Sequence, residues 1–467
     1  MEITTDVKNL PTRGREQITQ NYNILIGVLM ELAKDLEQQV KIAVAERQDI
    51  PKEILEELAK DITPCIKDRV AENVNTPIKI LEELAKDYDS GVRQGVARNP
   101  NTPIETLKEL ARDNDYGVRR DVARNSNTPI EILKKLASDE DYRVRQGVAE
   151  NTSTPLKILE KLAKDYNWHV RESVAKCPNA SAEVLSTLSK DEENLVRDVV
   201  AKNPNITEKI LQKLAKDDSS WVRQGIAENQ NITIEVLEEL AKDYDSSVRL
   251  KVAQHPKATI KILESLSKDE EFRVRKAVAE HPNTLTDILS NLSKDKDDYI
   301  RASVAKNPNT PLDILMDFTN DHSNRVKFSV AENLNVPAEV LLKLSKDMNE
   351  EIRAEVARNS NTPVETLKKL AKDYHNCVKI AVAENLNTPV EILVEFAHYC
   401  YYWKVRRAVA QNPNTPLETL ESLAKNDWEI SMAVAQNPIT SVEILVELAK
   451  NYDFHVRRAV AQNLPVK

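Results

Sequence analysis

The sequence predicts an all-α solenoid of about 17 tandem repeats, each about 26 residues long and built from two helices without strands. A Val-Ala or Ile-Ala pair recurs every 26 residues as far as Ala383, and then at steps of 27, 25 and 26. A fixed period of this length is typical of solenoids, propellers and repeat arrays. The strand-like alternation of apolar and polar residues is absent, which argues against a propeller or a β-solenoid. The alanines of these pairs are Ala45, Ala71, Ala97, Ala123, Ala149, Ala175, Ala201, Ala227, Ala253, Ala279, Ala305, Ala331, Ala357, Ala383, Ala410, Ala435 and Ala461.

The first helix of each repeat is clearest between Thr102 and Asp113. Thr102 is a good N-cap, because its hydroxyl can accept a hydrogen bond from a free N–H of the first turn. Pro103 suits the first helical position, and Glu105 stands where it would complete a capping box. We therefore expect a short helix of about three turns that ends near Asp113. Its apolar face, at helical spacing, is formed by Ile104, Leu107, Leu110 and Ala111.

The second helix follows a brief polar loop and carries Val118, Val122 and Ala123 on one face. In many repeats this segment ends in Asn-Pro. The residue before a proline disfavours the α region, so the helix is expected to stop there. A small residue often precedes the second valine, which predicts that neighbouring helices approach closely. These small residues are Gly95, Gly147, Ser173, Gly225 and Ala277.

Composition limits the class of protein. The net charge of −9 does not favour binding to nucleic acid or to an anionic membrane. The sequence contains no run of 18 or more apolar residues, so no membrane span is expected. The first residues lack the basic-then-apolar order of a signal peptide. The four cysteines are scattered, which suits a reducing cytosol and gives no recognisable metal-ligand spacing. We therefore expect a cytoplasmic protein.

One break in the repeat divides the chain. We expect an N-terminal tail or cap over residues 1–23, a regular array over 24–398, an irregular aromatic repeat over 399–432 and a C-terminal repeat over 433–467. The irregular repeat has one extra loop residue, the next loop is one residue short, and Ser431 stands where a basic residue is usual. No capping unit follows the last repeat, so its end is expected to receive a partner or a second copy.

Two charged columns run through the repeats. An aspartate closes each first helix and a basic residue follows six positions later. The arginines could track phosphates, or they could pair with aspartates of their own and the neighbouring repeat as a structural ladder. We favour the ladder, because both columns weaken in the same repeats near Ser431. Its clearest members are Asp87, Arg93, Asp113, Arg119, Asp139 and Arg145.

An asparagine column closes the second helices, with Asn99 and Asn125 as clear members. Asparagine tolerates turn geometry and bonds local backbone, so we expect a ladder that stabilises turns. His255 and His281 replace asparagine in consecutive repeats. One repeat step is too long for two imidazoles to share a zinc ion, so both are interpreted as turn residues.

Aromatic residues gather in the loops after the aspartate column. They could cover the core at one edge of the solenoid, which we favour, or form a recognition rim. The strongest candidates for binding a partner are Tyr401, Tyr402 and Trp403, because they disturb the repeat, together with Trp428. No catalytic constellation, glycine-rich phosphate loop or metal motif is present, so we expect neither enzymatic activity nor a cofactor.

The phrase from Val92 to Asp113, VRQGVARNPNTPIETLKELARD, resembles the leucine-rich repeat variant family. The resemblance covers about residues 24–463. It implies a right-handed superhelix in which α-helices alternate with short 3₁₀ helices. The spacing of aspartate and arginine is also similar to that of HEAT repeats. Some family members carry an N-terminal cysteine-ligated iron–sulfur cluster, but the first cysteine here is Cys65, so no cofactor is carried over.

Three functions follow as hypotheses. The first is a non-enzymatic scaffold that binds a protein on a concave face or loop rim. The second is nucleic-acid binding through exposed, unpaired arginines of the ladder, and the third is a self-assembling spacer joined through its C-terminal end. In the first, specificity would lie at positions that vary beside the arginine column: Gln94, Arg120, Gln146, Glu172, Leu250, Phe328 and Ile380.

Overall fold

The structure of this chain is a computed structural model, which describes residues 25–464. These residues form α-helices joined by short turns and contain no strand, so the predicted all-α solenoid of tandem repeats is confirmed. The expected tail over residues 1–23 lies outside the described residues. Contacts divide the chain into two compact units. We call residues 1–174 and 415–467 unit 1, and residues 175–414 unit 2.

The even-numbered helices carry the Val-Ala pairs. They are α-helical throughout, rather than 3₁₀, and most are nine residues long. Their bounds are α2 (Gln38–Ala45), α4 (Pro64–Glu72), α6 (Ser90–Arg98), α8 (Tyr116–Arg124), α10 (Tyr142–Glu150), α12 (Trp168–Lys176), α14 (Asn194–Lys202), α16 (Ser220–Glu228), α18 (Ser246–Gln254), α20 (Phe272–Glu280), α22 (Asp298–Lys306), α24 (Asn324–Glu332), α26 (Glu350–Arg358), α28 (Asn376–Glu384), α30 (Trp403–Gln411), α32 (Trp428–Gln436) and α34 (Phe454–Asn463).

The odd-numbered helices are the leucine-rich segments, and most are seven residues long. Residues 25–32 are also helical. The bounds are α3 (Lys52–Leu58), α5 (Ile78–Leu84), α7 (Ile104–Leu110), α9 (Ile130–Leu136), α11 (Leu156–Leu162), α13 (Ala182–Leu188), α15 (Glu208–Leu214), α17 (Ile234–Leu240), α19 (Ile260–Leu266), α21 (Thr286–Leu292), α23 (Leu312–Phe318), α25 (Ala338–Leu344), α27 (Val364–Leu370), α29 (Val390–Tyr399), α31 (Leu417–Leu423) and α33 (Val442–Leu448).

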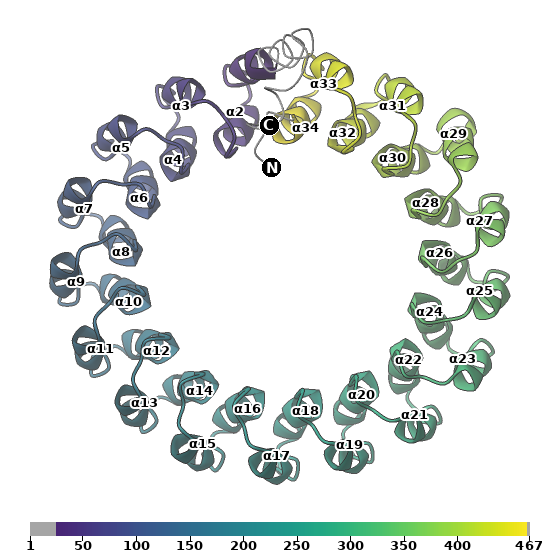
Figure 1. The fold of residues 1–467 in the computed structure, drawn as a ribbon, viewed down its shortest axis with the longest axis horizontal. Helices are drawn as coiled ribbons and strands as arrows, with labels where there is room; N and C mark the ends of the chain where they lie inside the picture. Colours follow the sequence, from purple (N-terminus) through teal and green to yellow (C-terminus); the bar gives the residue numbers. More distant parts are fainter. Residues whose placement is uncertain (1–24, 465–467) are drawn as a thin grey trace, which may run out of the picture. The chain divides into compact units, whose positions relative to one another are not determined.

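Within each unit, the even-numbered helices line the inner side of a curved stack and the odd-numbered helices line the outer side (Figure 1). Successive even-numbered helices pack against one another, for example α6 against α8 and α14 against α16. The core between them is made by the repeated valine and alanine, as at Val92, Val96 and Ala97, which are fully buried. Leu107 and Leu110 of α7 close the core from the outer side.

The start of the first helix differs from the prediction. Thr102 is buried and is not an N-cap: its hydroxyl donates to the main-chain oxygen of Val96, at 2.6 Å. The N-cap is Pro103, and no side chain caps that end. The threonine therefore satisfies a carbonyl at the end of the preceding helix, where the last turn leaves such groups without partners. A threonine caps the helix where proline is absent, as at Thr233.

The last repeat is not left uncapped, which corrects the expectation from the sequence. Helix α34 packs against α2, although the two stand far apart in the sequence, and both belong to unit 1. Asp35, just before α2, accepts hydrogen bonds from Arg457 of α34. The face of α34 that would otherwise receive a partner is therefore covered by the first repeat of the same chain.

Candidate functional site

The arginine and aspartate columns meet on the loops between helices. Arg93 donates from Nε and Nη2 to the two carboxylate oxygens of Asp113, at 2.7 and 2.9 Å. Its Nη1 donates to the main-chain oxygens of Asp87 and Tyr88, at 2.8 and 3.1 Å. The sequence predicts pairing with carboxylates of both repeats, but in the structure the contact of Arg93 within its own repeat is to main-chain oxygens. One guanidinium thus joins two successive loops.

The same bidentate pairing recurs along the chain. Arg119 reaches Asp139 at 2.8 Å and Arg145 reaches Asp165 at 2.7 Å, with the arginine side chains only 12% and 6% exposed. Burial alone would raise the pKa of Asp113, but hydrogen bonds from Arg93 and from the Asp115 N–H lower it. The guanidinium groups of these arginines are therefore engaged in hydrogen bonds within the chain. Further rungs of this kind are Arg197–Asp217, Arg223–Asp243, Arg249–Asp269, Arg275–Asp295, Arg301–Asp321 and Arg353–Asp373.

The asparagine column joins repeats as well as turns. The Asn99 amide nitrogen donates to the main-chain oxygens of Ala71 and Asn73 in the preceding repeat, at 2.7 and 2.8 Å. Its side-chain oxygen accepts from the Asn101 N–H, which is the local turn contact expected from the sequence. Asn125 makes the same contacts to Ala97 and Asn99. The contact between repeats was not predicted, because it depends on how the helices stack.

His255 takes the place of asparagine in this ladder. Its Nε2 lies 3.3 Å from the Asn229 oxygen, and its Nδ1 accepts from the Lys257 N–H. Burial lowers the pKa of His255, which favours the neutral ring that can both donate and accept. The interpretation of this histidine as a turn residue agrees with these contacts.

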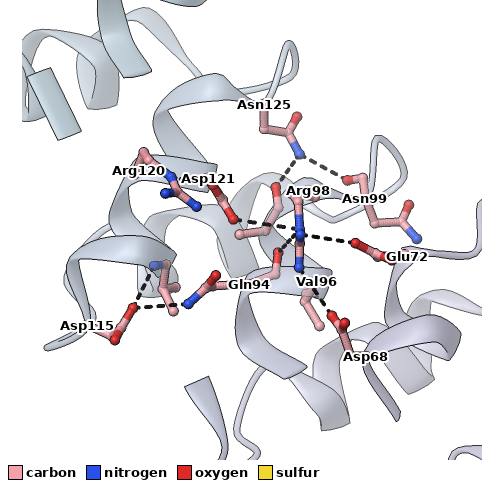
Figure 2. A network of polar contacts seen from close by, with 12 residues as sticks. Asp68, Glu72, Gln94, Val96, Arg98, Asn99, Asp115, Arg120, Asp121 and Asn125 are labelled. Carbon is pink, nitrogen blue, oxygen red and sulfur yellow. Dashed lines mark hydrogen bonds and ion pairs between the residues drawn. The ribbon is translucent and has the colours of Figure 1, made fainter. Parts of the chain in front are cut away.

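A charged network lies on the inner helices of unit 1. Figure 2 shows Arg98 of α6 between Asp68 and Glu72 of α4 and Asp121 of α8. Its nitrogens lie 3.2, 3.1 and 3.6 Å from those three carboxylates. Asp121 is 2% exposed and also accepts from Arg120 Nε at 2.8 Å. Burial, and then the charge of Glu72, raise the pKa of Asp68. The network therefore cross-links three repeats through Arg98, although the buried Oδ2 of Asp121 accepts no hydrogen bond among the described residues.

Exposed apolar and aromatic residues lie at the loop tips, and their side chains form no rung of these ladders. In several repeats the residue directly after the aspartate, or after the asparagine that replaces it at Asn451, is apolar or aromatic and exposed at the tip of the loop. Tyr88 is 79% exposed and Tyr452 is 87% exposed. The favoured interpretation, that loop aromatics cover the core, is wrong for these positions. The aromatic residues at helix starts vary: Trp428 and Tyr142 are half-buried, whereas Trp221 is 63% exposed.

Some of these tyrosines have a structural contact. Tyr166, Tyr244 and Tyr374 each lie beneath the guanidinium of the ladder arginine that binds the adjacent aspartate, at 4.7, 4.6 and 5.5 Å from the ring centroid. For Tyr88 and Tyr452 the corresponding residues are Lys67 and Ser431. Neither of these two tyrosines lies under a cationic side chain among the described residues. Tyr88 and Tyr452 thus lack the cation–π contact that the other three tyrosines make, although all five side chains are similarly exposed.

Four such tips stand on successive repeats of unit 1. We call Tyr452, Leu36, Ile62 and Tyr88 the unit 1 rim; the exposed fractions of their side chains are 87, 97, 88 and 79%. Ladder contacts connect neighbouring tips: Arg457 binds the oxygen of Tyr452 and the carboxylate of Asp35, and Lys41 binds Asp61. Leu36 and Ile62 were not predicted from the sequence, because neither side chain is aromatic.

The sequence candidates fall in separate places. Tyr401 is 97% exposed in the loop between α29 and α30, whereas Tyr402 and Trp403 are half-buried at the start of α30. Met348 and Tyr374 are the exposed loop-tip residues of the two preceding repeats of unit 2. Trp428 belongs to unit 1, begins α32 and stacks on His455 at 4.8 Å.

Other chemistry is not visible in the part of the chain that the structure describes. Within residues 25–464, no group of three or more His, Cys, Asp or Glu side chains is placed to hold a metal ion. Helices long and apolar enough to cross a membrane are also lacking in that range. The four cysteines are free thiols, and Cys65 is exposed.

These features define an α-solenoid repeat protein. A leucine-rich repeat variant domain model matches residues 405–464, and a leucine-rich repeat variant model matches residues 91–115. A solved structure described as a leucine-rich repeat variant with a novel repetitive structural motif is 31% identical; the match covers 47% of this chain and 87% of that chain, with a TM-score of 0.36. The chain belongs to the leucine-rich repeat variant family, as its sequence suggested.

A structure concerning Kap95p binding and the switch loops of RanGDP is also similar, at 12% identity and a TM-score of 0.31. That match covers 91% of this chain and 72% of the other. No curated protein matches the chain.

Proposed function

We propose that this chain is a scaffold that binds another protein through the unit 1 rim. The observation that carries the proposal is the run of four apolar tips that are 79–97% exposed on successive repeats. Keeping apolar area in water forgoes about 25 cal/mol for each Å². Contiguous exposed apolar residues mark interaction surfaces, and tyrosine is a favoured anchor in them.

The spacing and charge of the rim describe the partner. Packed helices lie roughly 8–10 Å apart, so four tips span on the order of 30 Å. An exposed lysine stands two residues before each tip: Lys450, Lys34, Lys60 and Lys86. A protein segment with apolar side chains at matching intervals and acidic residues beside them would be complementary to this edge. The Met348, Tyr374 and Tyr401 tips of unit 2 form a second, shorter candidate.

The other two hypotheses have less support. Nucleic-acid binding requires exposed, unpaired ladder arginines, but Arg93, Arg119 and Arg145 are each bound to an aspartate. A spacer joined through its C-terminal end requires a free face on α34, and that face lies against α2. The inner-face positions Gln94, Phe328 and Ile380 are half-buried, which leaves less apolar area for a partner than the rim offers.

The test replaces the four rim residues with asparagine. Asparagine occurs naturally at the equivalent loop position of another repeat, at Asn114. The variant Tyr452→Asn/Leu36→Asn/Ile62→Asn/Tyr88→Asn is compared with Tyr166→Asn/Tyr244→Asn, which removes isolated tips. We expect the rim variant to lose a protein partner from native lysate by at least about 100-fold in affinity, since two or more anchors disappear. The control variant is expected to keep it.

The rim variant is expected to unfold near the wild-type temperature, because exposed tips contribute little to stability. The control variant also removes the contacts of Tyr166 and Tyr244 with ladder arginines, so it is expected to be slightly less stable while it keeps the partner. Equal binding of the partner by wild type and the rim variant would refute the rim as the site. Nuclease-sensitive recovery of nucleic acid alone would favour the arginine hypothesis.

A further inference from the structure

The first and last repeats contact each other through the same Arg–Asp pairing that joins neighbouring repeats elsewhere in the array. Arg457 donates from Nε and Nη2 to Asp35, at 2.7 and 3.0 Å. The interior pair Arg249–Asp269 has 2.7 and 2.9 Å. The side chains of the terminal pair are 16 and 10% exposed, and those of the interior pair 11 and 6%. The terminal pair is therefore a full rung of the ladder.

The asparagine ladder also crosses this contact, but with a different residue. Position 47 is arginine, where later repeats have asparagine. Arg47 donates to the main-chain oxygens of Ala461 and Leu464, at 2.7 and 2.6 Å, and Asp49 holds its other edge. In the interior, Asn99 donates to two main-chain oxygens of its preceding repeat, Ala71 and Asn73. The longer side chain thus reaches the equivalent alanine oxygen, that of Ala461, and the oxygen of Leu464 in place of that of Asn463. Among the described residues, this contact joins two repeats that are distant in sequence.

The apolar faces at this contact are also those of interior repeats. Val40 and Val44 of α2, and Val456 and Val460 of α34, are all fully buried. Separating the two helices would expose these faces to water. Each would then be complementary to its opposite on any copy of the chain, because the contact is between two different surfaces, which is how heterologous assemblies and domain swaps form.

We propose that α2 and α34 form a clasp, a reversible joint between the first and last repeats, and that its alternative occupant is a second copy of this chain joined head to tail. No neighbouring peptide bond holds this joint, unlike every interior rung. Within one chain the two faces meet at high effective concentration, so the closed form prevails over joining of copies. If like charges at the clasp oppose closure within one chain, and another copy offers a face of opposite charge, joining of the two copies is expected to prevail over closure. This proposal does not depend on the proposed binding at the rim.

Charge reversal provides the test. Asp35→Arg places two cations at the clasp, and Arg457→Asp places two anions there. Each variant alone is expected to open and to show faster amide hydrogen exchange in α2 and α34, with interior helices unchanged. In an equimolar mixture, opposite charges meet at both joints, so light scattering is expected to give twice the mass of a single chain. The double variant Asp35→Arg/Arg457→Asp restores attraction within one chain and is expected to be monomeric with slow exchange.

Matched controls come from the interior rung. Arg249→Asp mixed with Asp269→Arg makes the same charge change where the chain is continuous, and is expected to stay monomeric. A mixture of the clasp variants that stays at the mass of one chain would refute joining of copies. Wild-type α2 and α34 exchanging as fast as in the single variants would refute the clasp itself.

Discussion

Arginine and lysine are not equivalent in the ladder. Arg93 contacts both loops that it joins, because a planar guanidinium offers five donors in a fixed geometry. Lys67, at the same position one repeat earlier, donates only to Asp87 at 2.8 Å, and Lys327 donates only to Asp347 at 2.8 Å. These lysine rungs secure the loop of the next repeat and leave the carbonyls of their own loop to water. The ladder is therefore weaker at those repeats.

Lys67→Arg is expected to stabilise the fold by about 0.5–1 kcal/mol, since it adds the missing loop contacts, and Arg93→Lys is expected to destabilise it by a similar amount. Urea denaturation of both variants measures the two changes. Burial alone would raise the pKa of Asp87, but hydrogen bonds from Lys67 and the Asp89 N–H lower it.

A carboxylate with a lowered pKa stabilises the fold above its unfolded-state pKa of about 3.9 and loses that contribution as pH falls through the lower value. The contribution of the Asp87 rung itself is therefore expected to be present at pH 7 in wild type and variant and to be lost as pH falls through the lowered pKa of Asp87. The gain from Lys67→Arg comes from contacts to main-chain oxygens, which do not titrate, so it is expected to persist in acid. A gain from Lys67→Arg that disappears once Asp87 is protonated would show that it comes from the Asp87 rung and not from the added main-chain contacts.

At the scale of helices, small residues allow the inner helices to approach. A Cβ on Gly147 of α10 would lie 2.9 Å from the main-chain oxygen of Arg120 and 3.2 Å from Ala123 Cβ, both in α8. No described residue has a positive φ, so this glycine is required for close packing and not for an unusual backbone. The sequence predicted this close approach from the small residues alone.

Gly147→Ala is expected to destabilise the array by about 1–3 kcal/mol, because a backbone atom cannot move aside as a flexible side chain would. Gly27→Ala is the control: it lies in the helix over residues 25–32, and its added Cβ would meet nothing within 4 Å. That change is expected to stabilise by about 0.5–1 kcal/mol through helix propensity. Calorimetry separates the two, and similar effects at both sites would contradict the packing argument.

At the scale of the molecule, the sequence predicts what recurs and misses what depends on stacking. The period of the alanines gave the class of fold, and the joint weakening of two columns near Ser431 identified the charge ladder. The sequence predicted that Thr102 would be an N-cap, but its hydroxyl donates to a main-chain oxygen of the preceding helix. The adjacency of Tyr452 and Leu36 could not be foreseen, since it arises only when the last repeat packs on the first.

We propose that the unit 1 rim, rather than the inner helices, binds a protein partner. A photo-crosslinking amino acid placed in turn at Ile62, at Asn114 and at Phe328 tests this most directly. Ile62 is in the rim, Asn114 holds the same loop position in a polar repeat, and Phe328 lies on an inner helix. We predict crosslinks to one protein from Ile62 and none from Asn114 or Phe328. Crosslinking from Phe328 and not from Ile62 would contradict the account and place the site on the inner helices.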